Sequence, residues 1–560
     1  MIKYFLFPAV FFLISITTFS QEQFTKFLSD ELDRNMAVLK KQEEPPYYIS
    51  LRVNEKTTFD INALYGNITK SEEKKERVLH TSLRVGSHEL DNFHEIRESR
   101  SHWFAGRRMN IIGIEDDEKS IKQRIWKSID ESYRDALNTY NQVKANIAVK
   151  VEGEDESDDF SIEKPEKYFE PPVKIEKLDF DVETWENRLR EYSAVFLKYP
   201  DIYDGKAGLD FKIERRVFVS TEGTQIEESG ISARLFIDGK VKADDGMELP
   251  LFLSYFAFLP EDLPDSNEIL KDVEKMAESL VALRTAPVAE PYEGPAMLSG
   301  VAAGVFFHEI FGHRIEGHRL KRSTDGQTFK NRIGDIVLPE HLSVIFDPQE
   351  TNYKGEDLYG HYKYDCQGVK GQKVTVVENG ILKDFLMSRT PIEDFPNSNG
   401  HGRAYAGREP VSRQSNMFIK TTEPLSIEEL REEFRKELKS QNKEFGFSFE
   451  TVRGGFTMTG RFIPNAFNVS PLLVYKVFAD GREDEMVRGV DLIGTPLAMF
   501  SQIIKAADDY GIFQGNCGAE SGWVQVSSVS PSLLVRQIET QKNIKSQDRP
   551  FILEAPDRDF

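Results

Sequence analysis

Apolar residues recur with different periods along the chain, and these periods predict where helices and strands lie. In 24–39 the apolar positions Phe24, Leu28, Leu32 and Met36 follow helical spacing, and the pattern ends before Pro45. Apolar runs separated by polar turns then predict three short strands at 47–53, 57–66 and 77–86. A long helix is expected in 120–150, and more strands are expected between Phe211 and Phe258.

The middle of the chain contains two segments that predict breaks between structured parts. Residues 151–167 are acidic and contain a proline, which predicts an exposed loop. A helix is expected over 266–284, and the prolines that follow it, at 287, 291 and 295, indicate a domain boundary. We therefore expect an α/β N-terminal region over 21–286, with two subdomains divided near 150–170 as an open alternative.

Beyond the prolines the pattern becomes strand-rich. Asn379-Gly380 and Asp480-Gly481 each lie between strand-like runs and predict hairpins. Ser426 and Glu429 form a capping-box pattern at the start of a helix, and a last helix is expected from Thr495-Pro496. The fold class predicted for the whole chain is α+β, with a strand-rich C-terminal domain over 287–560.

The N-terminus has the pattern of a secretory signal peptide. Lys3 precedes an apolar run from Tyr4 to about Ile16, and small and polar residues follow up to Ser20. An uncleaved membrane anchor is the alternative, but the run is short for a span. We expect cleavage of 1–20, export to the periplasm or the medium, and no stable membrane span in the mature protein.

Charge and cysteine content narrow the function classes. With 560 residues the chain can form two or three domains, and its net charge of −21 would repel nucleic acid over most of the surface. There are two cysteines, Cys366 and Cys517, so an exported protein of this size is not held together by a disulfide framework. The pair could form one bridge, or one cysteine could serve as a thiolate.

The stretch GVFFHEIFGHRIEGH, at 304–318, carries candidate metal chemistry. His308 and His313 are imidazole donors, and Glu309 is a carboxylate next to a ligand, which is the composition of a hydrolytic zinc site. In a regular α-helix residues five apart point about 140° away from each other, so these histidines share an ion only if the helix is distorted. A π-type widening or a break at Gly312 would bring them together. The alternative is a pair of ordinary histidines beside an apolar helix.

A third ligand is needed, and the sequence offers two sources. Glu316 and His318 would make the site local, whereas Cys517 would come from a glycine-rich loop far along the chain. A lone cysteine can also be a buried small apolar residue.

These residues together resemble the TldD/PmbA family, in particular its TldD-type zinc metallopeptidase branch. HEIFGH followed by Glu316-Gly317 is similar to the family's metal motif, and VVENGILKDFLMSR, NSNGHGRAY and GNCGAESG continue the resemblance in order. The resemblance implies that His308, His313 and Cys517 bind Zn²⁺ and that Glu309 is the catalytic base. His318 departs from the family pattern and keeps an open role, as does Cys366. The signal peptide also departs, because many relatives are cytoplasmic.

The resemblance implies a zinc-dependent peptidase that hydrolyses short or unfolded peptides, with Glu309 activating a zinc-bound water. It also implies a dimer, either of two copies or with a PmbA-like subunit. The competing hypothesis is a non-catalytic peptide-binding or assembly subunit with a vestigial metal site. Asn399, Arg403 and Arg413 lie in the similar segments, with roles in substrate binding or in loop contacts left open.

Overall fold

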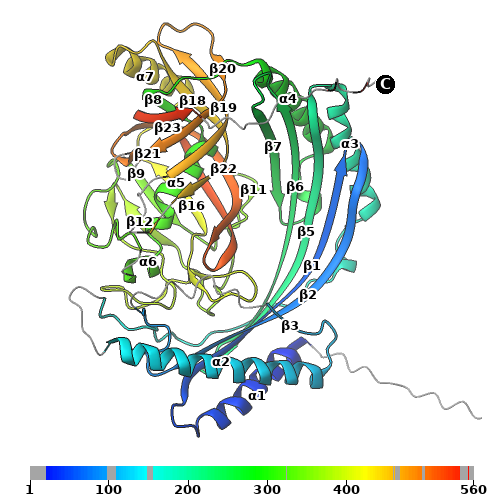
Figure 1. The fold of residues 1–560 in the computed structure, drawn as a ribbon, viewed down its shortest axis with the longest axis vertical. Helices are drawn as coiled ribbons and strands as arrows, with labels where there is room; N and C mark the ends of the chain where they lie inside the picture. The colour runs from blue at the N-terminus through cyan, green and yellow to red at the C-terminus, as the bar shows by residue number, and fades with distance from the viewer. Residues whose placement is uncertain are drawn as a thin grey trace, which may run out of the picture.

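The N-terminal part of the chain forms a long, curved sheet that is antiparallel except for one pair of strands (Figure 1). The computed structural model describes residues 21–96, 109–147, 155–322, 325–457, 459–460, 467–494 and 499–542, together with 553 and 556. Among these described residues, the N-terminal sheet has seven strands. Six follow the order β3-β2-β1-β5-β6-β4, and β7 also pairs with β6. Strands from both sides of residues 150–170 therefore share one sheet. The strands are β1 (Pro46–Leu64), β2 (Asn67–Val85), β3 (Asn110–Ile111), β4 (Lys167–Phe169), β5 (Ile202–Ser220), β6 (Gln225–Lys242) and β7 (Glu248–Ala257).

Two of the predicted strand boundaries are wrong, because polar residues continue the strands. The runs expected at 47–53 and 57–66 form the single strand β1, and β2 includes the polar residues from Asn67 onward. β1 is paired on both edges, with β2 and β5, so backbone hydrogen bonds hold its polar middle in place. The charged side chains of β1 also pair with opposite charges on the neighbouring strand, as Glu55 does with Arg77 at 2.6 Å, and such pairs stabilise a sheet. The turn is confined to Tyr65 (φ 45°) and Gly66 (φ 78°), as in a tight two-residue hairpin.

Four helices pack on the two ends of this sheet (Figure 1). Helices α1 and α2 share an apolar core with one end of strands β1, β2 and β5, and α3 and α4 share a second core with the other end. The predicted helices at 24–39, 120–150 and 266–284 are α1, α2 and α4. Their bounds are α1 (Gln21–Leu39), α2 (Glu118–Ile147), α3 (Val182–Ala194) and α4 (Ser266–Thr285), with short 3-10 turns η2 (Ile175–Lys177), η3 (Val195–Lys198) and η4 (Pro260–Asp262).

The acidic segment expected as an exposed loop is partly buried. Phe160 is 1% exposed and its ring lies 4.7 Å from that of Tyr48. The guanidinium groups of Arg84 and Arg389 each lie 3.8 Å from the centre of the same ring. Residues 155–166 do form a loop, and the prediction is wrong only for the buried stretch 159–161, where one aromatic residue anchors the segment between the two halves of the protein.

The C-terminal part forms a second sheet, which has twelve strands within the described residues. The predicted boundary at 286/287 lies between α4 and the first strand of this sheet. The strands are β8 (Glu293–Leu298), β9 (Leu342–Phe346), β12 (Val374–Glu378), β13 (Ile381–Leu382), β16 (Asn416–Thr421), β17 (Pro424–Leu425), β18 (Phe445–Thr457), β19 (Phe467–Phe478), β20 (Glu485–Val487), β21 (Val490–Gly494), β22 (Ile503–Ala519) and β23 (Gly522–Lys542). Two short pairs are separate from it, β10 (Asn352–Tyr353) with β11 (Glu356–Asp357), and β14 (Gly402–Arg403) with β15 (Val411–Ser412).

Several local predictions in this half are confirmed. Asn379 (φ 47°) and Gly380 (φ 79°) join β12 and β13, and the turn containing Asp480-Gly481 joins β19 and β20. Ser426 and Glu429 form the reciprocal capping box of helix α7 (Ile427–Ser440). The last helix predicted from Thr495-Pro496 begins on residues outside the described part, and so does the predicted signal peptide at 1–20.

Helix α5 (Gly300–Ile310) is buried on every side. Gly300 and all residues from Ala302 to Ile310 are buried. It packs against β18, β22 and β23, and an all-apolar circumference is typical of a helix enclosed in a core. The site that follows it is therefore built on a rigid element.

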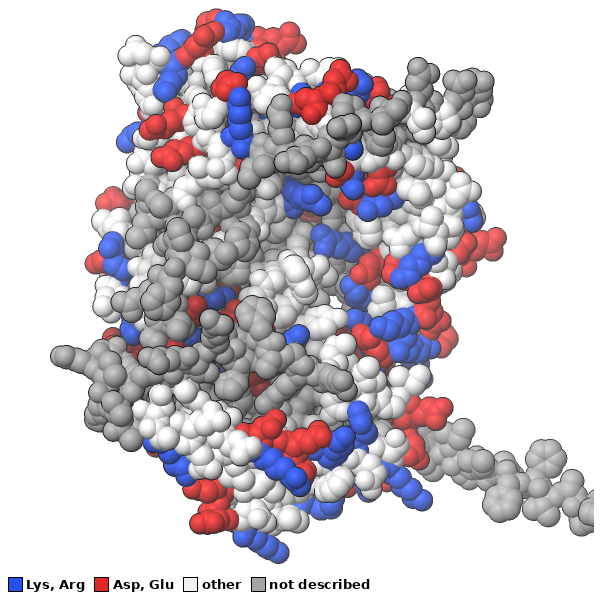
Figure 2. All heavy atoms as spheres, viewed as in Figure 1, with Lys and Arg blue, Asp and Glu red and all other residues white. Residues whose placement is uncertain are grey.

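A cavity of about 2490 Å³ lies between the two halves. Figure 1 shows the C-terminal half against the concave side of the curved N-terminal sheet. Residues of β2 and β7 line the cavity from one half, and residues of α5, β18 and β22 line it from the other. On the outer face seen in Figure 2, basic and acidic side chains are interspersed. Among the described residues, none of the helices is long and apolar enough to cross a membrane.

Buried arginines connect the two halves. Arg52 of β1 is 1% exposed and donates hydrogen bonds to three backbone carbonyls of the C-terminal half, those of Cys366, Tyr405 and Arg408. Arg389 of the C-terminal half pairs with Glu222 at 2.6 Å and donates to the carbonyl of Ser161. These contacts fix the C-terminal half against the sheet.

Candidate metal centre

A break in the helix brings the two histidines of the motif together. His308 lies in the last turn of α5, the α-helix ends at Ile310, and the 3-10 turn η5 (Gly312–Arg314) carries His313. The two imidazole rings are 5.0 Å apart and nearly perpendicular, at 79°. The predicted departure from a regular helix at Gly312 is confirmed, and it takes the form of a break.

Close packing explains why glycine occupies position 312. A Cβ atom there would lie 2.0 Å from Oε1 of the buried Gln414, whose Nε2 donates to the carbonyl of His308 at 3.3 Å. Arg314 donates to the carbonyls of Glu309 and Ile310 at 2.9 and 3.1 Å. These carbonyls lose their helical partners at the break, and the charged side chain satisfies them.

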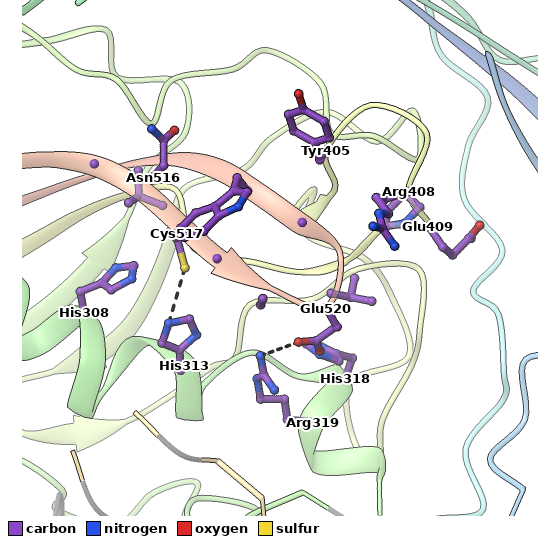
Figure 3. A pocket seen from close by; sticks show the side chains of 18 of the residues that line it. His308, His313, His318, Arg319, Tyr405, Arg408, Glu409, Asn516, Cys517 and Glu520 are labelled. Atoms are coloured by element: carbon purple, nitrogen blue, oxygen red, sulfur yellow. Dashed lines mark hydrogen bonds and ion pairs between the residues drawn. The ribbon is translucent and has the colours of Figure 1, made fainter. Parts of the chain in front are cut away.

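Cys517 reaches the histidines from a strand and not from the loop that its glycines suggested. It lies on β22 opposite Val524 of β23, and its Sγ is 3.5 Å from Nε2 of His313 (Figure 3). One donor atom from each of His308, His313 and Cys517 lies within 4.8 Å of the others, and all three residues are buried. The structure thus brings together residues that are 209 positions apart in sequence (517 − 308).

The donor set fits a zinc ion. Two imidazoles and one thiolate are common zinc ligands, and tetrahedral nitrogen and sulfur ligands lie about 3.4–3.6 Å apart, close to the distance between His313 and Cys517. Nδ1 of His308 is buried without a hydrogen-bond partner among the described residues. A buried nitrogen of this kind needs a partner, and a metal ion would supply one.

The electrostatic surroundings favour the thiolate form of Cys517. Burial raises the pKa of the thiol, but nearby His313 and Arg413 outweigh burial and hold it well below its usual value. Burial lowers the pKa of His313, and Cys517 and Glu316 together raise it above its usual value. Because the thiolate is the form that binds metals, the cluster is prepared for a cation.

Glu309 faces the same cavity without being one of the clustered donors. Its side chain is 8% exposed, and no described residue donates a hydrogen bond to its carboxylate. Gly455 on β18 leaves room for it, since a Cβ at that position would lie 2.3 Å from Cγ of Glu309. Glu309 thus lines the same cavity as the clustered donors.

The two local alternatives for the third ligand have other partners. Nε2 of His318 lies 2.5 Å from Oε1 of Glu520, and Oε2 of Glu316 lies 3.3 Å from Nδ1 of His313, on the far side of that ring from Cys517. Neither belongs to the cluster of candidate ligands. Cys366 is a free, buried cysteine that accepts a hydrogen bond from Arg216 at 3.2 Å, so the two cysteines do not form a bridge.

The residues with open roles make contacts within the protein, and one of them reaches the site. Asn399 and Arg403 hydrogen-bond to backbone groups, as the loop-contact alternative predicts. Arg413 donates to the carbonyl of Cys517 at 2.6 Å, a contact that no local pattern indicated. Glu520 was also missed, although it lies three residues after Cys517 in the segment GNCGAESG.

The protein belongs to a structural class with two sheets, and it has a buried His-His-Cys cluster and a carboxylate at the cavity between its two halves. Residues 291–542 match the model of the PmbA/TldA metallopeptidase C-terminal domain. A metalloprotease of Methanocaldococcus jannaschii is 26% identical over 74% of this chain and 83% of its own length. A zinc metalloprotease TldD homolog of Saccharolobus solfataricus is 23% identical over 80% of this chain and 84% of its own length. A metalloprotease of Archaeoglobus fulgidus is 32% identical, and the match spans 48% of this chain and 59% of that relative.

Solved structures share the fold over nearly the whole chain. TldE from Thermococcus kodakarensis superposes with a TM-score of 0.60 at 14% identity, covering 92% of this chain and all of that one. A Thermotoga maritima protein gives a TM-score of 0.59 at 14% identity, covering 91% of this chain and 99% of that one. These structures show a shared fold, and the sequence similarity to the PmbA/TldA metallopeptidase domain covers residues 291–542.

Proposed function

We propose that the protein is a zinc-dependent peptidase that hydrolyses short or unfolded peptides. The observation that carries the proposal is the buried cluster of His308, His313 and Cys517, which lines the same cavity as Glu309. The metalloprotease names of the relatives support the same class of reaction.

The residues divide the chemistry between binding and proton transfer. A zinc ion held by the two imidazoles and the thiolate would supply Lewis acidity toward a peptide carbonyl. A carboxylate oxygen of Glu309 accepts a proton from the water that attacks this carbonyl. It then delivers the proton to the amide nitrogen as the C–N bond breaks. Glu309 suits this role because no described residue donates a hydrogen bond to its carboxylate.

In the described part of the chain, strands β22 and β18 each have a segment that is paired on one edge only, and such an edge can bind an extended peptide. Over 510–519 β22 pairs with β23, and over 451–457 β18 pairs with β19, with no other strand partner among the described residues. Both segments line the cavity on the side of the metal cluster. A peptide that adds as a strand would be held by its backbone, which favours unfolded substrates over particular sequences.

Zinc removal and reconstitution test the proposal. The purified protein should bind about one zinc per chain by elemental analysis, and a chelator should abolish peptide hydrolysis until zinc is returned. Failure to bind zinc would contradict the metal site. Full zinc binding without hydrolysis of any peptide in a diverse library would instead favour the non-catalytic peptide-binding subunit.

We also propose that the chain is exported and works as a dimer, of two copies or with a PmbA-like subunit. The apolar run after Lys3 motivates the first proposal, and the solved structure of TldE, a related fold, motivates the second. N-terminal sequencing of protein from the periplasm or medium should begin near Gln21. Light scattering of the purified protein, alone and with a PmbA-like partner, measures the assembly.

A further inference from the structure

We propose that Glu316 is the positioning residue of the metal centre: it fixes the ring of His313 and, through Arg413, couples that ligand to the strand of Cys517. The inference rests on the proposed zinc site and adds to it a residue that does not itself bind the ion. A chain of buried contacts runs from one candidate ligand to another.

The first contact orients a ligand. Oε2 of Glu316 lies 3.3 Å from Nδ1 of His313, while Nε2 of the same ring lies 3.5 Å from Sγ of Cys517. A carboxylate can only accept a hydrogen bond, so when Nε2 binds a metal ion the remaining proton of the imidazole lies on Nδ1, facing Glu316. A carboxylate behind a histidine ligand fixes the tautomer and makes the metal-facing nitrogen a better donor.

The second contact reaches the other ligand. Oε1 of Glu316 lies 3.6 Å from Nε of Arg413, and both side chains are fully buried. Arg413 donates through one terminal nitrogen to the carbonyl of Cys517 at 2.6 Å. Through the other it donates to Oγ of Ser521 and to the carbonyl of Gly522, at 2.8 and 2.9 Å, which fixes the end of the β22–β23 hairpin. The ligands from α5–η5 and from β22 are thus connected by one carboxylate and one guanidinium group.

The backbone holds Glu316 in this place. It bridges to Leu386, and the amide of Gly317 donates to the carbonyl of Leu386 at 2.8 Å. A Cβ at Gly317 would lie 2.4 Å from Sδ of Met387, so the chain approaches this segment closely because glycine follows Glu316. The Glu-Gly pair after the second histidine therefore has a physical role in the site.

Arg319 offers a matched control. Its Nε donates to Oε2 of Glu316 at 2.8 Å, and its NH2 group donates to Glu520 at 3.1 Å. Glu316 and Glu520 both neutralise this buried arginine, but only Glu316 contacts a candidate ligand. The variants Glu316→Gln and Glu520→Gln each remove one negative charge beside Arg319, and they differ in the contact with His313.

The experiment measures zinc affinity by competition with a chromophoric chelator, and the visible spectrum of the cobalt-substituted protein. We expect Glu316→Gln to weaken zinc binding by about 10- to 100-fold and to shift the cobalt bands, with Glu520→Gln within about twofold of wild type. Equal losses in both variants, or no loss in Glu316→Gln, would overturn the inference. If Glu316→Gln does not fold, Glu316→Asp keeps the charge but withdraws the oxygen from His313, and the same loss is expected. A wild-type protein that binds no zinc would contradict the proposed function itself.

Discussion

At the scale of single residues, the proposed function assigns metal binding and proton transfer to different side chains. Three donors lie in one buried cluster, whereas Glu309 lines the same cavity and is not among them. This separation allows each role to be removed without the other.

Glu309→Gln should keep zinc and lose turnover. The amide is close in size to the carboxylate but cannot take a proton from water, so kcat should fall by about 10²- to 10⁴-fold. Zinc content and peptide hydrolysis are measured in the same preparation. Glu356→Gln, which changes an exposed carboxylate of the same cavity, serves as the control and should retain activity. A Glu309→Gln variant that loses its zinc would show that Glu309 is a ligand.

The two cysteines should respond differently to substitution. Cys517→Ser removes a thiolate donor. Zinc affinity should fall by at least about 100-fold, because substituting a residue that only supports a ligand can already weaken binding by about 100-fold. Cys366→Ser should keep zinc and activity, because its contact with Arg216 needs only an acceptor. Zinc titration of both variants checks this, and mass spectrometry without reductant should find no Cys366–Cys517 crosslink.

The candidate ligands differ in how well the sequence predicts them, because they differ in their separation along the chain. His308, Glu309 and His313 are close in sequence, so their spacing alone raised the possibility of a shared ion. Cys517 lies on β22, far along the chain, so the sequence offered it only as one of two sources of a third ligand, and the resemblance to a family favoured it. The contacts of Glu316 and Arg413 depend on side-chain packing between distant segments, which no periodicity encodes.

At the scale of elements, the helix break is the feature that makes shared ligation feasible. α5 is fully enclosed, and the chain departs from it within two residues. Gly312 permits this because Gln414 occupies the space that a side chain would need.

Gly312→Ala should destabilise the break by overpacking it. The added methyl displaces Gln414, whose amide then loses its bond to the carbonyl of His308, and the free energy of unfolding should fall by about 1–3 kcal/mol. Zinc affinity should fall with it. In a Gln414→Ala background the same substitution should cost less, because the space is empty. Denaturant unfolding of the four proteins measures the coupling, and fully additive effects would contradict this account.

Elements with clear local signals were predicted well, and elements held by pairing were not. The capping box of α7 and the Asn379-Gly380 turn are encoded within a few residues. The polar middle of β1 resembles a turn in sequence but is a strand because both of its edges are paired with neighbours. Phe160 makes its acidic segment part of the interface between the two halves, which depends on partners far along the chain.

At the scale of the whole molecule, the position of the cavity between the two halves bears on which substrates can reach the site. The candidate metal ligands line this cavity and are buried. A substrate that adds to β18 or β22 as a strand has to be extended, as the proposed function requires.

The protein should therefore cleave a substrate only when it is unfolded. A small disulfide-bonded domain should resist cleavage, and the same domain after reduction and alkylation should be cleaved at least about 100-fold faster. The cleavage products are measured by mass spectrometry, and a short peptide serves as the positive control. Equal rates for the folded and unfolded forms would show that the site is open to the surface.

The arginine contacts between the two halves have a consequence for how peptides pass through the molecule. Hydrogen bonds to charged groups contribute about 1.5–3 kcal/mol each, and Arg52 and Arg389 together make several of them across the seam. Separating the two halves would break all of these hydrogen bonds at once. An opening motion for each substrate would therefore be costly. Under the proposed function, peptides would therefore have to enter and leave the cavity while the two halves stay joined.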